Sequence, residues 1–130
     1  MILVDTSVWI ELLNGRLRQG IAGQELLNFV TCGPVLQEVL QGLRESPKSV
    51  AFRERLLAVP VVSDPLSIST FLEAADIYRL GRAKGYTVRS STDCLIARVA
   101  IENNLPVWHF DRDFEVIARY TSLRTWRRVH

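Results

Sequence analysis

Four acidic residues occupy positions from which a carboxylate can act on a ligand. Asp5 follows the apolar run MILV, and Asp111 follows a second one, PVWHF. Asp93 opens an apolar helical stretch, whereas Glu38 falls off the apolar stripe of another. Sets of carboxylates without histidine or cysteine suit Mg²⁺ or Mn²⁺ rather than zinc. If the fold brings the four acids together, they predict a divalent-metal site.

Asp5 marks the point where a predicted strand ends and a helix begins. Asp5, Thr6 and Ser7 are all residue types that cap helices, and the apolar residues Val8 and Trp9 follow them. In open parallel α/β sheets the ligand crevice lies outside the carboxyl ends of the strands, so an acid there points at the site. For this aspartate alone the alternative is an ordinary helix cap, and only matching acids elsewhere favour the ligand role.

The other acids also have structural alternatives. Glu38 lies beside Gly42, one turn later, which would leave room for another group, but this segment alone favours a solvated helical glutamate. Asp93 fits a first-turn acid that the helix dipole favours. Asp111 repeats the geometry of Asp5 at a strand end. Asp113 ranks below Asp111 as a site residue because it fits the opening of the next helix.

The elements that must position these acids alternate along the chain. Strands are predicted near Met1, Val59, Val107 and Leu123, with the last at an edge. Helices are predicted after Asp5 and over residues 24–30, 34–44, 49–57, 68–84, 93–104 and from 113 onward. This alternation predicts an α/β fold, a three-layer α/β/α domain with a mostly parallel central sheet, as one domain over residues 1–130.

Composition limits the class of protein. The 130 residues are 48% hydrophobic, which suits one well-buried core. No apolar stretch approaches the roughly 20 residues that span a bilayer, and the start lacks the features of a signal peptide, so we expect a cytoplasmic protein without a membrane partner. Cys32 and Cys94 lack metal-ligand spacing, which predicts reduced, buried thiols.

Basic residues gather in the second half of the chain. Residues 1–76 carry six basic and nine acidic side chains, whereas residues 77–130 carry ten basic and five acidic ones and end in a basic segment, 127–130. Fourteen of the sixteen basic residues are arginines, which suit bidentate phosphate contacts. We expect the arginines beside the proposed site to contact a nucleic-acid backbone, with solvated helix faces or a protein contact as the alternative. They include Arg79, Arg82, Arg89 and Arg112, together with Lys84.

The acids and the arginines together indicate a reaction. Four carboxylates in one crevice repel one another unless cations neutralise them. Divalent ions held by carboxylates activate water for attack on phosphodiesters, and a pair about 3.5–4 Å apart stabilises both the attacking and the leaving oxygens. The pattern therefore predicts metal-dependent hydrolysis of a phosphodiester.

These residues also resemble a known family. The segments DTSVWI, P-x-x-x-E-x-x-x-G, STDCLIA and HFDRDF are similar to the four acidic blocks of PIN-domain nucleases, and the chain length is similar to that of VapC toxins of VapBC toxin–antitoxin pairs. The resemblance implies a compact PIN fold, Mg²⁺-dependent endoribonuclease activity with Mn²⁺ as a substitute, and inhibition by a cognate VapB-type antitoxin. It places Asp5, Glu38, Asp93 and Asp111 in a catalytic, metal-binding site, with Ser7 as a polar contact. We also expect a homodimer.

One position departs from the family pattern. Many relatives carry Thr or Ser two residues before the last acid, whereas this chain has His109. No second histidine or cysteine is spaced to join it as a metal ligand, so a hydrogen-bonded structural role is favoured.

Two other classes of protein share parts of the pattern. Haloacid-dehalogenase-like phosphatases also start from a strand-end aspartate, but they usually need a second one two residues on, where this chain has Ser7. A catalytically silent RNA- or protein-binding module would keep the fold and the basic face without needing the acids. Metal-dependent RNA cleavage distinguishes the nuclease from that module.

Overall fold

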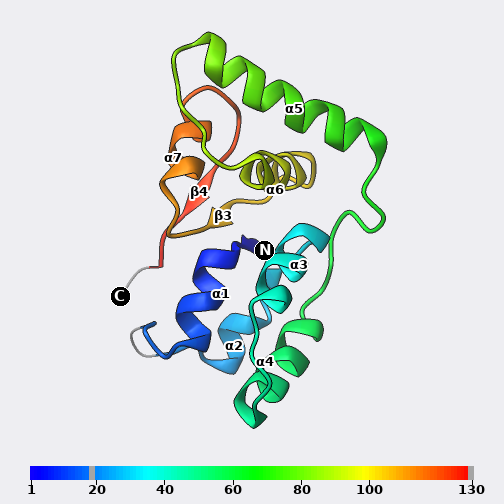
Figure 1. The fold of residues 1–130 in the computed structure, drawn as a ribbon, viewed down its shortest axis with the longest axis vertical. Helices are drawn as coiled ribbons and strands as arrows, with labels where there is room; N and C mark the ends of the chain where they lie inside the picture. The colour runs from blue at the N-terminus through cyan, green and yellow to red at the C-terminus, as the bar shows by residue number, and fades with distance from the viewer. Residues whose placement is uncertain (18–19, 129–130) are drawn as a thin grey trace.

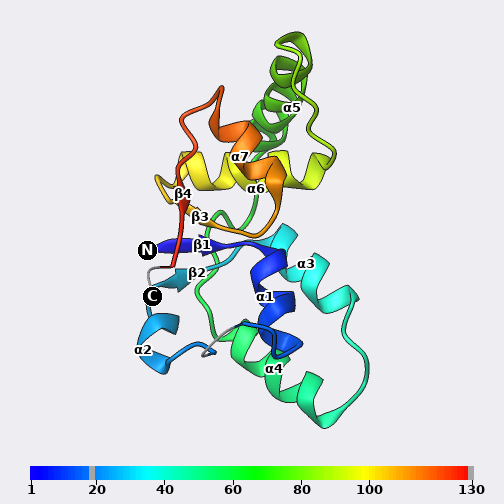
Figure 2. The same ribbon diagram turned by 90° about the vertical axis from the view of Figure 1, so that its left-hand side faces the viewer.

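A short parallel sheet runs through the middle of the molecule (Figure 2). The computed structural model describes residues 1–17 and 20–128, so residues 129–130 of the basic end lie outside it. The strands are β1 (Ile2–Val4), β2 (Phe29–Val30), β3 (Val107–Trp108) and β4 (Thr125–Trp126). Their order is β2-β1-β3-β4, and each neighbouring pair is parallel. The predicted parallel sheet, with an edge strand near the carboxyl end of the chain, is confirmed.

Helices cover both sides of this sheet, as the alternation of strands and helices predicts (Figures 1 and 2). One side carries α1 (Thr6–Leu13), α2 (Gly23–Leu26) and α4 (Pro47–Leu57), and the other carries α6 (Ser91–Glu102) and α7 (Arg112–Ala118). Helix α3 (Gly33–Gln41) contacts both α1 and α6, and α5 (Ile68–Ala83) lies across the far side of α6. The α/β fold class is confirmed.

The core explains why β1 occupies the centre of the sheet. Its three residues are all buried, as expected of a parallel strand with helices on both faces. Leu3 pairs with Val30 on one side and with Val107 on the other. Cys32 and Cys94 are free and buried, as predicted. Among the described residues, no helix has the length and apolar character needed to cross a membrane.

Two predicted elements are wrong. The structure ends the helix predicted over residues 24–30 at Leu26. Residues 29 and 30 form β2 instead. Phe29 and Val30 are almost fully buried beside β1, so pairing with the central strand overrides the local helical pattern. The strand predicted at 59–63 is only an isolated parallel bridge between Thr31 and Val61. Pro60 lacks an N–H for a ladder, which limits this segment to an edge.

The packing of α5 against the end of α7 gives a first testable prediction. Tyr120 donates a hydrogen bond to the carbonyl of Ile77 (2.9 Å) and stacks on Tyr86, so its ring is held in place. A Cβ added at Gly81 would lie 2.5 Å from the Tyr120 hydroxyl oxygen. Gly81→Ala is expected to destabilise the fold because an overpacking cost of about 1–3 kcal/mol outweighs the helix-propensity gain of about 1 kcal/mol. Thermal unfolding measures the difference.

Gly42→Ala is the matched control for this change. A Cβ there would meet only carbonyl oxygens of its own helix, at 3.7 and 3.9 Å. We expect its melting temperature to equal or slightly exceed that of the wild type. A Gly81→Ala protein as stable as the control would show that Tyr120 can move aside.

Candidate active site

Asp5 caps a helix with one carboxylate oxygen and leaves the other without a partner among the described residues. It follows β1, caps α1 through a hydrogen bond from the Ser7 N–H (3.1 Å) and is 2% exposed. The Ser7 hydroxyl donates a second hydrogen bond to the same carboxylate oxygen, Oδ2 (2.6 Å). The other oxygen, Oδ1, is buried without a hydrogen-bond partner among the described residues. The capping hydrogen bonds thus use only one of the two carboxylate oxygens, Oδ2.

Glu38 lies in α3 and is half-buried, so it is not a solvated surface glutamate. Its Oε1 accepts a hydrogen bond from the Thr6 hydroxyl (2.9 Å), which links α3 to the start of α1. Burial raises the pKa of Asp5, and the nearby charge of Glu38 adds a smaller effect in the same direction. No group from another element lies close to Gly42 among the described residues, because only carbonyl oxygens of its own helix lie within 4 Å of an added Cβ.

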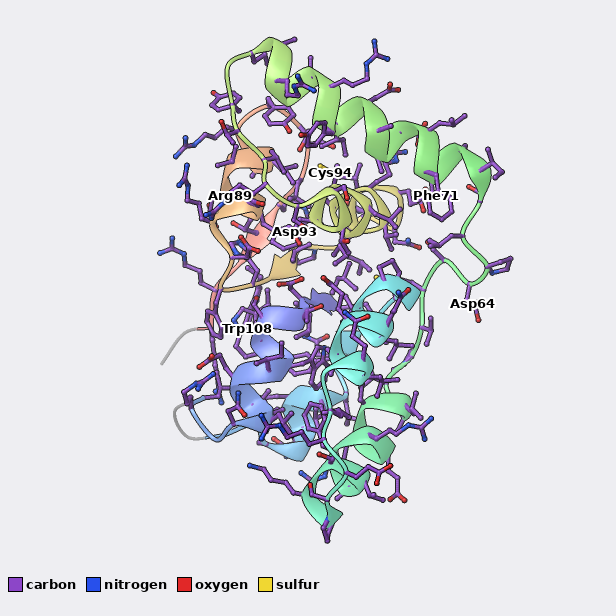
Figure 3. The ribbon with its side chains drawn as sticks, in the orientation of Figure 1. Asp64, Phe71, Arg89, Asp93, Cys94 and Trp108 are labelled. Atoms are coloured by element: carbon purple, nitrogen blue, oxygen red, sulfur yellow. The ribbon has the colours of Figure 1, made fainter. Side chains whose placement is uncertain are left out.

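Three aspartates from two helices form a tighter cluster. Asp93, Asp111 and Asp113 each offer one carboxylate oxygen, and these three atoms lie within 4.8 Å of one another. Asp93 lies in the first turn of α6, and Figure 3 shows it beside the segment that carries Arg89. Asp111 caps α7 by accepting a hydrogen bond from the Asp113 N–H (2.9 Å). The fold therefore brings two of the predicted acids together with a third that ranked lower.

The electrostatics of this cluster are strained in the absence of a cation. Burial and a hydrogen bond with Asp111 are the largest causes that raise the pKa of Asp93 to about 9. The charges of Asp5, Asp111 and Asp113 act in the same direction. Without a compensating positive charge, Asp93 therefore holds a proton at neutral pH.

Asp113 ranks below Asp111 in the sequence, but the structure includes both in the same acidic cluster. It is 2% exposed, and its Oδ2 accepts hydrogen bonds from the N–H groups of Arg89 (3.0 Å) and Ser90 (3.1 Å). It thereby fixes the segment that leads into α6 and hence the position of Asp93. The signal in the sequence was the D-R-D spacing, which places a second acid within one helical turn of the strand end.

Buried carboxylate oxygens without partners gather at this site. Among the described residues they are Asp5 Oδ1, Asp93 Oδ2 and Asp113 Oδ1. The Arg89 Nε atom lies 3.9 Å from Asp113 Oδ1, which is beyond hydrogen-bond distance, and its side chain is largely exposed. Buried charged groups need a compensating partner, and hard oxygen donors of this kind suit Mg²⁺ or Mn²⁺. The residues present therefore fit a divalent cation.

His109 has the structural role that its isolation in the sequence favours. Its Nδ1 accepts a hydrogen bond from the Asp111 N–H (3.1 Å), and its Nε2 lies 3.0 Å from Glu115 Oε1. Because Nδ1 is an acceptor, the proton of the neutral ring belongs on Nε2, which donates to Glu115. His109 thus holds the backbone of Asp111 in place.

The basic residues divide into two groups. Arg89 and Arg112 are exposed and lie in segments that carry or adjoin the aspartates. Arg79 and Arg82 lie on the outer helix α5, where Arg79 is near Asp76 (4.0 Å) and Arg82 lies over the Tyr78 ring (5.8 Å). The first group therefore adjoins the aspartates in the chain, whereas the second projects from α5.

Comparisons with known proteins place this architecture in a family. A model of the PIN domain matches residues 2–120. Ribonuclease VapC11 of Mycobacterium tuberculosis and VapC ribonuclease Mb1587 of Mycobacterium bovis are each 35% identical over 131 residues, which cover 95% of this chain and 96% of the relative.

A solved structure gives the same assignment of the fold. It is that of VapBC2 from Rickettsia felis, bound to a DNA fragment from their promoter. It matches with a TM-score of 0.72 at 20% identity and covers 98% of this chain and all of that chain. The fold, the family model and the two relatives agree over nearly the whole length, and the chain belongs to the PIN-domain family, among the VapC-type proteins.

Proposed function

We propose that this protein is a divalent-metal-dependent endoribonuclease, the toxin component of a VapBC-type toxin–antitoxin pair. The observation that carries the proposal is the group of unpartnered, buried carboxylate oxygens on Asp5, Asp93 and Asp113. Each such group costs folding free energy unless a cation compensates it. The two relatives named as ribonucleases support RNA as the substrate.

The proposed metal-binding set is Asp93, Asp111 and Asp113 together with Asp5, and Glu38 completes the acidic site from α3. The first three lie closest to one another, and Asp5 raises the pKa of Asp93 by its charge. Bound here, Mg²⁺ or Mn²⁺ would supply Lewis acidity for the attack of water on a phosphodiester and for the departure of the leaving oxygen.

The side chains of the protein have positioning roles in this proposal. Ser7 orients Asp5 by a hydrogen bond to Oδ2, and Oδ1 stays without a partner among the described residues. Asp113 fixes the backbone that precedes Asp93, and His109 fixes that of Asp111. Such a rigid surrounding shell preserves the geometry that phosphodiester hydrolysis requires.

The partner in this proposal is a VapB-type antitoxin, and the toxin forms a homodimer. The structure from Rickettsia felis is of a VapBC assembly, which supports a partner of that class. An antitoxin would inhibit the enzyme most directly by neutralising the acidic site or by covering it.

A catalytically silent binding module is the weaker alternative. Such a module would gain nothing from several carboxylates whose charges, together with burial, raise the pKa of Asp93 to about 9. Replacing buried charges by apolar residues is often neutral or stabilising, so a module without catalysis has no physical need for this cluster.

The test of the proposed function is RNA cleavage under control of the metal. The purified protein, free of antitoxin, is expected to cut single-stranded RNA in millimolar Mg²⁺ or Mn²⁺, to stop in excess EDTA and to resume when the ion is restored. A matched sample bound to its antitoxin should be inactive. Binding of RNA without cleavage under all of these conditions would contradict the proposal and favour the silent module.

Arg112 gives a separate prediction for substrate binding. It is exposed directly after Asp111, so Arg112→Ala should weaken the binding of unrelated RNAs by similar factors. One lost phosphate contact should also reduce the slope of log affinity against log salt by about 0.7. Fluorescence anisotropy at several salt concentrations measures both effects.

Arg53→Ala is the control for this measurement, because Arg53 is exposed on α4, in the acidic half of the chain. It removes the same charge away from the aspartates. Equal slopes for the two variants would mean that the substrate does not pass over Arg112.

A further inference from the structure

Phe110 carries the most exposed aromatic ring of the chain. Its exposed fraction is 55%, and the next is Phe71 at 46%. All tryptophan and tyrosine side chains are at least half-buried. Exposing a phenylalanine ring sacrifices favourable burial, so its position is informative. This ring lies directly between β3 and Asp111.

The backbone of Phe110 is fixed to the acidic site. Its N–H donates a hydrogen bond to the Ser7 hydroxyl oxygen (3.0 Å), and that hydroxyl donates in turn to Asp5 Oδ2 (2.6 Å). On the other side, Asp111 follows immediately in the chain. The ring therefore lies at a set position relative to two of the acids.

Two tryptophans of the sheet pack in a row behind the Phe110 ring. Trp108 contacts it edge to face, with a centroid distance of 6.1 Å, and Trp108 itself is only 3% exposed. Trp126 lies 5.0 Å from Trp108 in a similar arrangement. A ring supported in this way has little rotamer freedom to lose when a flat ligand covers its open face.

Phe110 also lines two neighbouring hollows, together with Arg16 and Leu17. The larger, of about 640 Å³, extends past Trp126 towards the carboxyl end, and its lining includes Arg16, Arg112, Arg127 and Arg128. The smaller, of about 540 Å³, lies against Ser7 and the end of α1. Arg16 pairs with Glu11 and Arg128 with Glu25. Neither Arg112 nor Arg127 forms an ion pair with another described residue.

We propose that the open face of Phe110 stacks on a nucleobase of the RNA beside the phosphodiester that is cut. An aromatic platform bordered by arginines is the arrangement that binds single strands, with bases on the ring and phosphates on the cations. Because stacking requires an unpaired base, the substrate class is single-stranded RNA or a loop. This inference rests on the proposed function, which brings a phosphodiester to the adjacent acids.

RNA fits this surface better than a protein segment does. The two arginines without ion pairs line the larger hollow together with Asp111 and Phe110, where the phosphates of a bound strand would pair with them. A peptide could also cover Phe110, and the test separates the two occupants.

The experiment is a double-mutant cycle between the ring and the base. A fluorescein-labelled, single-stranded RNA decamer of mixed sequence, and ten versions with one abasic site each, are titrated onto Asp93→Asn protein with and without Phe110→Ala. In the presence of Phe110, one abasic position is expected to weaken binding about 10- to 100-fold. Phe110→Ala should cause a similar loss with the intact decamer, and the two changes together should cost no more than either alone.

Control variants define the chemistry of the contact. Phe110→Trp keeps a π face and should retain the affinity, whereas Phe110→Leu keeps apolar bulk and should lose most of it. Phe71→Ala removes the second most exposed phenylalanine ring, on α5 and distant from Trp108 in Figure 3, and should change nothing.

Two outcomes would overturn the inference. One is additive losses at every abasic position; the other is unchanged RNA affinity in Phe110→Ala with weakened binding of the antitoxin, which would assign the ring to a protein contact. Because affinity is measured without cleavage, a wild-type protein that fails to cut RNA would count against the proposed function and not against the stacking.

Discussion

Asp93→Asn is expected to reduce RNA cleavage at least about 100-fold while the protein stays folded. Loss of groups that only support metal ligands typically costs 10- to 100-fold, and Asp93 belongs to the proposed metal-binding set itself. Asparagine has nearly the same size, so the change leaves no cavity at the start of α6. Single-turnover cleavage in Mg²⁺, with circular dichroism to verify folding, measures the effect.

Asp76→Asn is the matched control, since Asp76 is an exposed aspartate on α5 whose loss removes the same charge. It should cut RNA at the wild-type rate. Asp113→Asn should also reduce cleavage, which would establish that the underrated acid belongs to the site. RNA affinity in these site variants should be retained or increased, because negative charge is removed from the path of a polyanion. Wild-type cleavage by Asp93→Asn would refute the metal-site assignment.

The metal-free protein is expected to lose stability as the pH rises from about 5 to 8. The folded state raises the pKa of Asp93 to about 9, whereas an unfolded aspartate titrates near 4. Between these values the folded state keeps a proton that the unfolded state releases, so the free energy of unfolding falls as the pH rises. Asp93→Asn lacks this proton and should therefore be more stable than the wild type by a margin that grows with pH.

Divalent ions should reverse this penalty. A ligand that binds only the folded state stabilises it by about 2.7 kcal/mol at 100 times its Kd, and ionised carboxylates bind it best, so the gain should be larger at pH 8 than at pH 5. Melting curves with Mg²⁺, Mn²⁺ or EDTA at each pH measure the shift. Asp76→Asn should follow the wild type, and Asp93→Asn should gain less from the ion. A melting temperature indifferent to millimolar metal would argue against a cation at this cluster.

Local pattern was sufficient where an element carries its own signals. The apolar run before Asp5, the helix start at Pro34 and the apolar helix after Ser90 all appear in the structure close to their predicted bounds. The local pattern failed to predict β2, because Phe29 and Val30 form a strand only through pairing with β1. The strand prediction for residues 59–63 failed for the opposite reason: the β-branched residues of this segment reach the sheet edge but form only one bridge there.

The sequence by itself determined the chemical character of this protein: a parallel α/β fold, three acids at strand and helix ends with a fourth on a helix, and arginines near them. These follow from residue type and periodicity, which act over a few neighbouring positions. Only the tertiary structure decided which acids meet. It placed Asp113 in the cluster because its carboxylate accepts the N–H groups of Arg89 and Ser90, more than twenty positions earlier in the chain. It turned Glu38 towards Thr6 and fixed the exposed ring of Phe110 through Ser7, 103 positions away. Contacts between residues so distant in sequence depend on how layers pack, and no local pattern encodes them.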